Sequence, residues 1–135
     1  RCILTIDFRL VPGQDPQEIT AKVEDILARL RTDVPNFQAE LKVINERVPV
    51  ESKSEEAIIK AALQVKKALG HKDLDIYGVN YYTDASIFVP ATRVPAVIIG
   101  PGPAGQAHQP DEYVEIEKLL EAVKFYIALS MEMLG

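Results

Sequence analysis

Residues 95–113 read PAVIIGPGPAGQAHQPDEY, and this stretch organises the second half of the chain. An apolar run at 94–99 is followed by a loop rich in glycine and proline at 100–105, and then by His108. A continuous apolar run bounded by turns is typical of a strand buried on both faces, as in a parallel sheet. We therefore expect an α/β arrangement, with His108 beyond the carboxyl end of this strand, where open α/β sheets bind ligands.

The elements on either side of this stretch follow from apolar periodicity and capping residues. Ser54 predicts the start of a helix, with Glu55 and Glu56 in its first turn, and Gly70 predicts its end. A short strand is expected at 74–79, a short helical turn at 85–89 and a final helix at 114–134. The apolar stripe expected on the final helix consists of Ile116, Leu119, Leu120, Val123, Tyr126, Ile127, Met131 and Leu134.

The first half shows a different pattern. Residues 2–10 and 37–46 alternate between apolar and polar side chains, which predicts two half-buried strands. Between them, Asp15 and Pro16 predict the start of an amphipathic helix over 16–31. The expected order is strand-helix-strand, then helix-strand-short helix-strand-helix, so the fold class is α/β, with an α+β first part. Residues 47–53 are predicted to form a linker, which places the domain boundary near residue 50.

Composition excludes several functional classes. The chain has 47% hydrophobic and 26% charged residues, which is an ordinary balance for a globular protein. A net charge of -5 without any run of Lys or Arg argues against nucleic-acid binding. No apolar stretch approaches the length of a membrane span. Cys2 is the single cysteine, and the first ten residues carry Asp7 and Arg9 rather than a signal-peptide core, so we expect a cytoplasmic protein. The chain opens inside an expected strand without Met, which predicts that it begins within a larger protein.

His108 is the first candidate for chemistry. A neutral imidazole on this loop could coordinate a metal ion, and Asp111 or Glu112 could hold its second ring nitrogen. A lone histidine is a weak zinc signal, however. The alternative is a surface-loop histidine, with Asp111 capping the next helix.

Two further candidates lie elsewhere in the chain. Thr83 and Asp84 stand at the start of the short helical turn, where a hydroxyl and backbone N–H groups could bind a carboxylate. The alternative is that Asp84 only caps the turn. Arg9 has the planar guanidinium that suits a substrate carboxylate, and its alternative is a surface ion pair with Asp7. His71 is expected to be a solvated histidine beside the end of a helix.

The order and spacing of these residues resemble the C-terminal third of the co-catalytic zinc aminoacylase family. That family includes acetylornithine deacetylase, succinyl-diaminopimelate desuccinylase, carboxypeptidases that release glutamate, and aminoacylase-1. The resemblance covers essentially the whole chain. Its motifs are Ile6-Asp7-Phe8-Arg9, Pro12-Gly13, Thr83-Asp84-Ala85, Pro95, Gly100-Pro-Gly102, Ala107-His108 and Glu112-Tyr113-Val114.

The resemblance implies a catalytic domain interrupted by a lid, or dimerisation, domain. Residues 1–50 match the second half of a ferredoxin-like lid, and residues 51–135 match the last segment of the catalytic domain. At single positions, the resemblance implies that His108 is the last zinc ligand, that Arg9 holds the substrate carboxylate as in some members, and that Thr83 and Gly102 lie near the substrate. Asp84, beside Thr83, is also expected to bind substrate. The family's other ligands and its catalytic glutamate lie upstream, so no catalytic residue is expected in this chain.

The activity implied is hydrolysis of the amide bond of N-acyl amino acids or short peptides, in amino-acid biosynthesis. The parent protein is expected to be a homodimer through the lid and to hold two zinc ions, with cobalt or manganese as alternatives. The chain alone is expected to be inactive and to bind zinc weakly. A non-catalytic α/β dimerisation or interaction module is the alternative function, because half-exposed strands invite pairing. A small ferredoxin-like regulatory domain suits the change of pattern near residue 50 less well. The acyl group, the amino acid and the cellular metal stay open.

Overall fold

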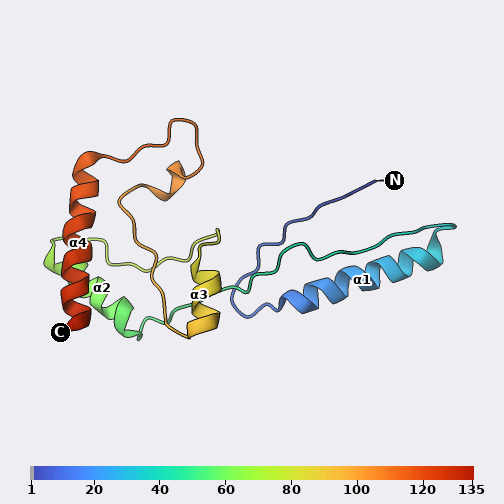
Figure 1. The fold of residues 1–135 in the computed structure, drawn as a ribbon, viewed down its shortest axis with the longest axis horizontal. Helices are drawn as coiled ribbons and strands as arrows, with labels where there is room; N and C mark the ends of the chain where they lie inside the picture. Colours follow the sequence, from blue (N-terminus) through green and yellow to red (C-terminus); the bar gives the residue numbers. More distant parts are fainter. Residues whose placement is uncertain (1) are drawn as a thin grey trace. The chain divides into compact units, whose positions relative to one another are not determined.

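The computed structural model describes residues 2–135, which form four α-helices and one turn of 3₁₀ helix (Figure 1). These residues divide into two compact units. The first holds residues 2–51 and Val79–Val94, and the second holds Ser52–Gly78 and Pro95–Gly135. The elements are α1 (Pro16–Asp33), α2 (Ala57–Ala68), α3 (Ala85–Thr92), η1 (Ala104–Gln106) and α4 (Ile116–Leu134).

None of the helices described combines the length and the apolar character that crossing a membrane requires.

The expected α/β fold class is wrong, because residues 2–135 contain no β-strand. The segments 2–10, 37–46, 74–79 and 94–99, all expected as strands, are not paired into any sheet. Many of their apolar side chains consequently face solvent: Ile3 is 79% exposed, Ile44 76% and Val94 62%. The physical reason is that alternation shows which side chains a sheet would bury, whereas a strand also needs a neighbour to complete its hydrogen-bond ladder.

Helix α1 begins where the sequence predicts. The backbone N–H of Gln17 donates to Oδ1 of Asp15 at 2.9 Å, and Pro16 occupies the first helical position. At the other end, Arg31 is a cation in the last turn, where the helix dipole favours positive charge. Its Nη2 also donates to the carbonyl of Ala39 at 2.8 Å. Arg31 therefore ties the end of α1 to the segment that follows it.

Helices α2 and α4 lie side by side and form the core of the second unit (Figure 1). Ala62 and Val65 of α2 pack with Phe125 of α4, and each of the three is at most 5% exposed. The rings of Phe125 and Tyr126 meet edge to face, with their centroids 6.0 Å apart. Burial of these apolar groups is the main favourable term that joins the two helices. Partly buried Ile99, Ala128 and Leu129 complete the cluster.

The apolar stripe expected on the final helix is not the face that packs. Phe125, which that stripe omitted, is the buried residue of α4, whereas Ile116 is 76% exposed and Met131 70%. Helix α4 carries apolar residues around most of its circumference, so periodicity alone does not single out its packed face.

The two ends of α2 differ in how well the sequence predicts them. The cap expected at Ser54 is wrong: the helix begins at Ala57, and Ser54 instead donates to Oε1 of Glu55 at 2.7 Å. That hydrogen bond lowers the pKa of the Glu55 carboxyl. The end at Gly70 is confirmed. Gly70 has φ +85°, and the following N–H, that of His71, donates to the carbonyl of Lys66 at 3.0 Å, which closes the helix.

Candidate functional site

The segment leading to the glycine-rich loop is attached to the second unit at two points. At the first, the hydroxyl of Ser52 donates to the carbonyl of Ala96 at 2.6 Å and accepts from its N–H at 2.9 Å. At the second, the hydroxyl of Tyr126 on α4 donates to the carbonyl of Ile99 at 2.7 Å. Hydrogen bonds from the side chains of Ser52 and Tyr126 thus hold residues 96–99, which lead into the loop. A neighbouring strand would hold such a segment in a sheet.

Successive tight turns shape the loop between this segment and α4. The N–H of Gln106 donates to the carbonyl of Pro103 at 2.9 Å, and the N–H of Gln109 donates to the carbonyl of Gln106 at 3.2 Å. His108 and Asp111 have φ angles of +63° and +60°, which place both in the left-handed region that few residues other than glycine enter. The loop therefore has a specific backbone path at the histidine.

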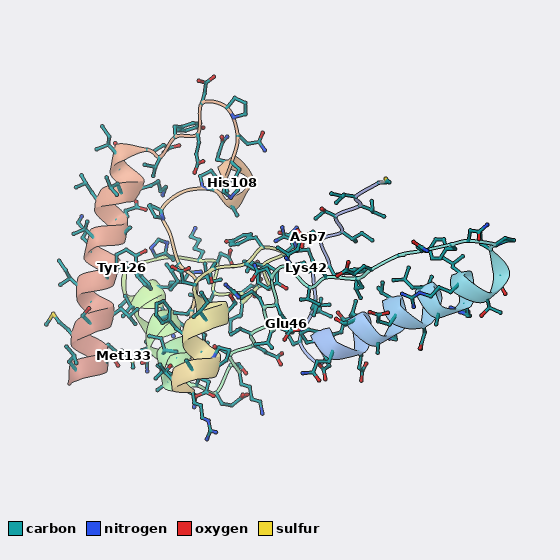
Figure 2. The ribbon with its side chains drawn as sticks, turned by 45° about the vertical axis from the view of Figure 1, so that its right-hand side comes forward. Asp7, Lys42, Glu46, His108, Tyr126 and Met133 are labelled. Atoms are coloured by element: carbon teal, nitrogen blue, oxygen red, sulfur yellow. The ribbon has the colours of Figure 1, made fainter. Side chains whose placement is uncertain are left out.

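His108 is exposed on this loop (Figure 2). The N–H of His108 donates to Oε2 of Glu112 at 3.1 Å. The sequence offered Glu112 as a partner for the imidazole, whereas its carboxylate binds the main chain instead. The hydrogen bond of His108 to Glu112 thus leaves the ring nitrogens of the imidazole uninvolved.

His108 is the candidate metal donor of this loop. Across residues 2–135, no three His, Cys, Asp or Glu side chains gather in a way that could hold a metal ion. A catalytic zinc site usually has three protein ligands, and imidazole nitrogen is one of the ligand types it prefers. A single imidazole does not by itself complete such a site.

Gly102 lies beside a hollow of about 360 Å³ in the second unit. A Cβ added at Gly102 would meet nothing within 4 Å, so the loop backbone is open at this point. Lys118 on the rim donates to Glu121 at 2.9 Å. This hydrogen bond, together with the opposite charges, raises the pKa of Lys118 and lowers that of Glu121. The hollow is lined by Pro101, Gly102, Pro103, Tyr113, Glu115 and Lys118.

Arg9 lies in the first unit and is engaged by two neighbours. Its Nη2 is 2.7 Å from Oδ2 of Asp7, and its Nε donates to the same oxygen at 2.9 Å. The guanidinium carbon also stands 5.4 Å from the centroid of the Tyr82 ring, a cation–π distance. The pairing with Asp7 is the alternative that the sequence left open for Arg9. The stacking on Tyr82 is a contact that sequence reasoning missed.

Thr83 and Asp84 stand at the start of α3. The hydroxyl of Thr83 accepts from the N–H of Ala85 at 3.2 Å, whereas Asp84 occupies the N-cap position without a side-chain hydrogen bond. The hydroxyl expected near a substrate therefore caps the helix in this structure. The Asp84 carboxylate is exposed.

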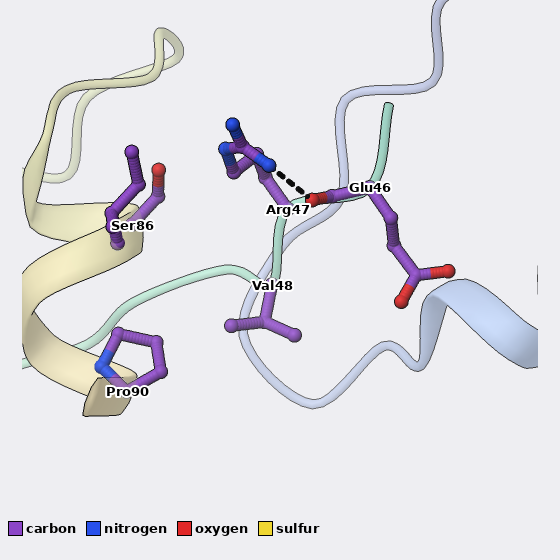
Figure 3. A pocket seen from close by; sticks show the side chains of 6 residues that line it. Glu46, Arg47, Val48, Ser86 and Pro90 are labelled. Carbon is purple, nitrogen blue, oxygen red and sulfur yellow. Dashed lines mark hydrogen bonds between the residues drawn. The ribbon is translucent and has the colours of Figure 1, made fainter. Parts of the chain in front are cut away.

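A second hollow, of about 250 Å³, lies in the first unit beside α3 (Figure 3). Arg47 stands on its rim, where its Nη1 donates to the carbonyl of Glu46 at 2.8 Å. Sequence reasoning missed this hollow because residues 47–53 read as a linker. An arginine within a predicted linker is a weak signal for a binding site. The lining consists of Glu46, Arg47, Val48, Ser86, Ile87 and Pro90.

The candidate residues divide between the two units. His108 and Gly102 belong to the second unit, and Arg9, Thr83 and Asp84 belong to the first. The roles expected of these five residues stay predictions.

Comparison with known proteins places the chain in a family. Residues 4–132 match the model of peptidase family M20/M25/M40. The chain is 28% identical to the acetylornithine deacetylase of Myxococcus xanthus, over 88% of its own length and 30% of that protein. It is 33% identical to the acetylornithine deacetylase of Salmonella arizonae, over 84% of its length and 28% of that protein. The chain thus spans less than a third of these relatives, and no solved structure matches it. Because the family model covers nearly the whole chain, the protein belongs to peptidase family M20/M25/M40.

Proposed function

We propose that this chain is the C-terminal part of a metal-dependent amide hydrolase that releases an amino acid from an N-acyl amino acid. The observation that carries the proposal is the family match over residues 4–132, joined by relatives named acetylornithine deacetylase. Deacetylation of an acylated amino acid is accordingly the first activity to test. Desuccinylation and dipeptide hydrolysis are the competing activities within the same chemistry.

In this proposal His108 is the metal ligand that the chain contributes. Its exposed imidazole and its fixed backbone support that role. Zinc, with cobalt or manganese as alternatives, would be held by His108 together with residues outside this chain. When bound, such an ion lowers the pKa of a coordinated water and polarises the amide carbonyl. The chain by itself is proposed to be inactive, since a single imidazole does not make a catalytic metal site.

The other candidates are proposed as substrate contacts. Arg9 carries the charge that suits the carboxylate of an amino acid, and Asp7 and Tyr82 support its guanidinium. Gly102 leaves the loop backbone open to a ligand. Thr83 and Asp84 offer a hydroxyl and a carboxylate at the start of α3.

A substrate panel tests the activity. The complete natural gene product that carries this chain is incubated with N-acetyl-L-ornithine, N-succinyl-diaminopimelate and a dipeptide, and free amine release is measured. We expect the gene product to hydrolyse N-acetyl-L-ornithine fastest, and residues 1–135 alone to hydrolyse none of the three. Hydrolysis by residues 1–135 at the rate of the whole gene product would overturn the proposal, as would a whole gene product inert toward all three.

A second candidate function is homodimerisation through the first unit. Leu4 is 80% exposed and Ile44 76%, and both lie in alternating segments that are unpaired among residues 2–51. Unpaired extended segments with apolar faces are sites for pairing with another chain. Light scattering of the gene product is expected to show a dimer, and the double substitution Leu4→Lys and Ile44→Lys is expected to shift it to monomer. A wild-type protein that stays monomeric at all concentrations would rule this function out.

A further inference from the structure

We propose that Glu112 is a positioning residue for His108. The inference rests on the proposed function, since it assumes that the imidazole of His108 binds the metal. It adds that the carboxylate of Glu112 sets the direction in which that imidazole leaves the loop. The observation that carries it is the hydrogen bond from the His108 N–H to Oε2 of Glu112, at 3.1 Å.

The backbone of His108 needs such support. At φ +63° it occupies the left-handed region, where a residue with a Cβ is held only if the surroundings specify it. A hydrogen bond from an N–H to an ionised carboxylate is stronger than one to a neutral acceptor. Glu112 supplies this stronger bond at a residue with a left-handed backbone.

Glu112 is itself anchored on the same loop. Its own N–H donates to the carbonyl of Gln109 at 3.2 Å, and the N–H of Gln109 donates in turn to the carbonyl of Gln106. The carboxylate reaches back from this anchored position to His108, four residues earlier. The two hydrogen bonds thus link both ends of the segment 108–112 to each other.

These contacts fix the direction of the Cα–Cβ bond of His108, from which the imidazole is reached by side-chain rotation. Because the bond from the backbone to the Cβ of His108 is fixed relative to its main chain, a change in the backbone angles at residue 108 swings the ring. Ligand groups must be held to within about 0.5 Å of their working position. Loss of the Glu112 acceptor should therefore weaken metal binding by about 10- to 100-fold, the range typical of groups that orient ligands.

The test compares three substitutions in the complete gene product. Glu112→Ala removes the acceptor, Glu112→Gln keeps a carbonyl oxygen of the same reach, and Glu117→Ala removes an exposed carboxylate from the first turn of α4. Metal affinity is measured by competition with a chelator. Amide hydrogen exchange of the peptide that contains His108 is measured by mass spectrometry.

Glu112→Ala is expected to accelerate exchange at His108 and to weaken metal binding about 10- to 100-fold. Glu112→Gln is expected to recover part of both properties, because its neutral carbonyl oxygen accepts a weaker hydrogen bond than a carboxylate. Glu117→Ala should match wild type. Equal losses in Glu112→Ala and Glu112→Gln, or faster exchange in Glu112→Ala without a loss of affinity, would overturn the inference. His108→Ala separates this failure from that of the proposed function, because an unchanged metal affinity in His108→Ala would sink the ligand assignment itself.

Discussion

Ser52 binds both backbone groups of Ala96, a residue 44 positions away along the chain. Its hydroxyl donates to the carbonyl at 2.6 Å and accepts from the N–H at 2.9 Å. A neighbouring strand would normally satisfy these two groups. The hydroxyl of Ser52 satisfies both groups here. It thereby holds the start of the segment 96–99, which leads to the loop of His108.

Replacing Ser52 should destabilise the second unit. Ser52→Ala leaves the N–H and the carbonyl of Ala96 without their partner, so we expect the free energy of unfolding to fall by about 1 to 2 kcal/mol. Urea denaturation followed by circular dichroism measures this change. Ser54→Ala is the matched control, because Ser54 bonds only the exposed carboxylate of Glu55. Equal stability of the two variants would contradict the role given to Ser52.

The hydroxyl of Tyr126 should contribute in the same way at the other end of the segment. Tyr126→Phe keeps the ring against Phe125 and removes the hydrogen bond to Ile99, so we expect a loss of about 0.5 to 1.5 kcal/mol in the free energy of unfolding. Amide hydrogen exchange in residues 96–102 should accelerate in parallel. Unchanged exchange in this segment would mean that α4 does not hold residues 96–99.

The packing of α2 on α4 depends on Phe125. Phe125→Ala removes a side chain that is 5% exposed and leaves a cavity beside Ala62 and Val65, so we expect a loss of about 3 kcal/mol in the free energy of unfolding. Thermal denaturation of the 135-residue chain measures this loss. Phe88→Ala provides the comparison, since Phe88 is 62% exposed and its loss should stay within about 0.5 kcal/mol. Similar effects of the two substitutions would refute the core assignment.

Tyr77 provides a pH-dependent prediction. Reduced hydration of its hydroxyl raises its pKa above the ordinary value, and the carboxylates of Asp73 and Asp75 raise it further. A raised pKa in the folded state means that its stabilising contribution is complete below about pH 10 and is lost as pH rises through the folded pKa. In Asp73→Asn/Asp75→Asn, the ultraviolet titration of tyrosine should shift toward lower pH. A titration curve identical to wild type would contradict this interpretation.

The helices were predictable because their signals are local. Asp15 and Pro16 mark the start of α1, and Gly70 marks the end of α2, through contacts within a few residues of each position. A capping interaction needs no partner elsewhere in the chain. The start of α2 was predicted wrongly because the hydroxyl of Ser54 bonds the carboxylate of Glu55 and not a backbone N–H of the helix.

The strands were not predictable for the opposite reason. A strand is defined by a neighbour, and the alternation at 2–10 or the apolar run at 94–99 carries no information about whether that neighbour is present. The prediction of the packed face of α4 was wrong for a similar reason, because the buried Phe125 and the exposed Met131 are both apolar. At the candidate site, the motif around His108 was visible in the sequence. The hydrogen bond from its backbone to Glu112 depends on a turn geometry that the sequence does not specify.

Metal content is the most direct test of His108. The complete gene product is purified as wild type, His108→Ala and His71→Ala, and bound zinc is measured by mass spectrometry after dialysis. His71 is the other histidine of the chain and lies just after the end of α2. We predict that His108→Ala retains less zinc and loses more than about 100-fold in kcat/KM, whereas His71→Ala keeps the wild-type values. Wild-type zinc content in His108→Ala would contradict the assignment.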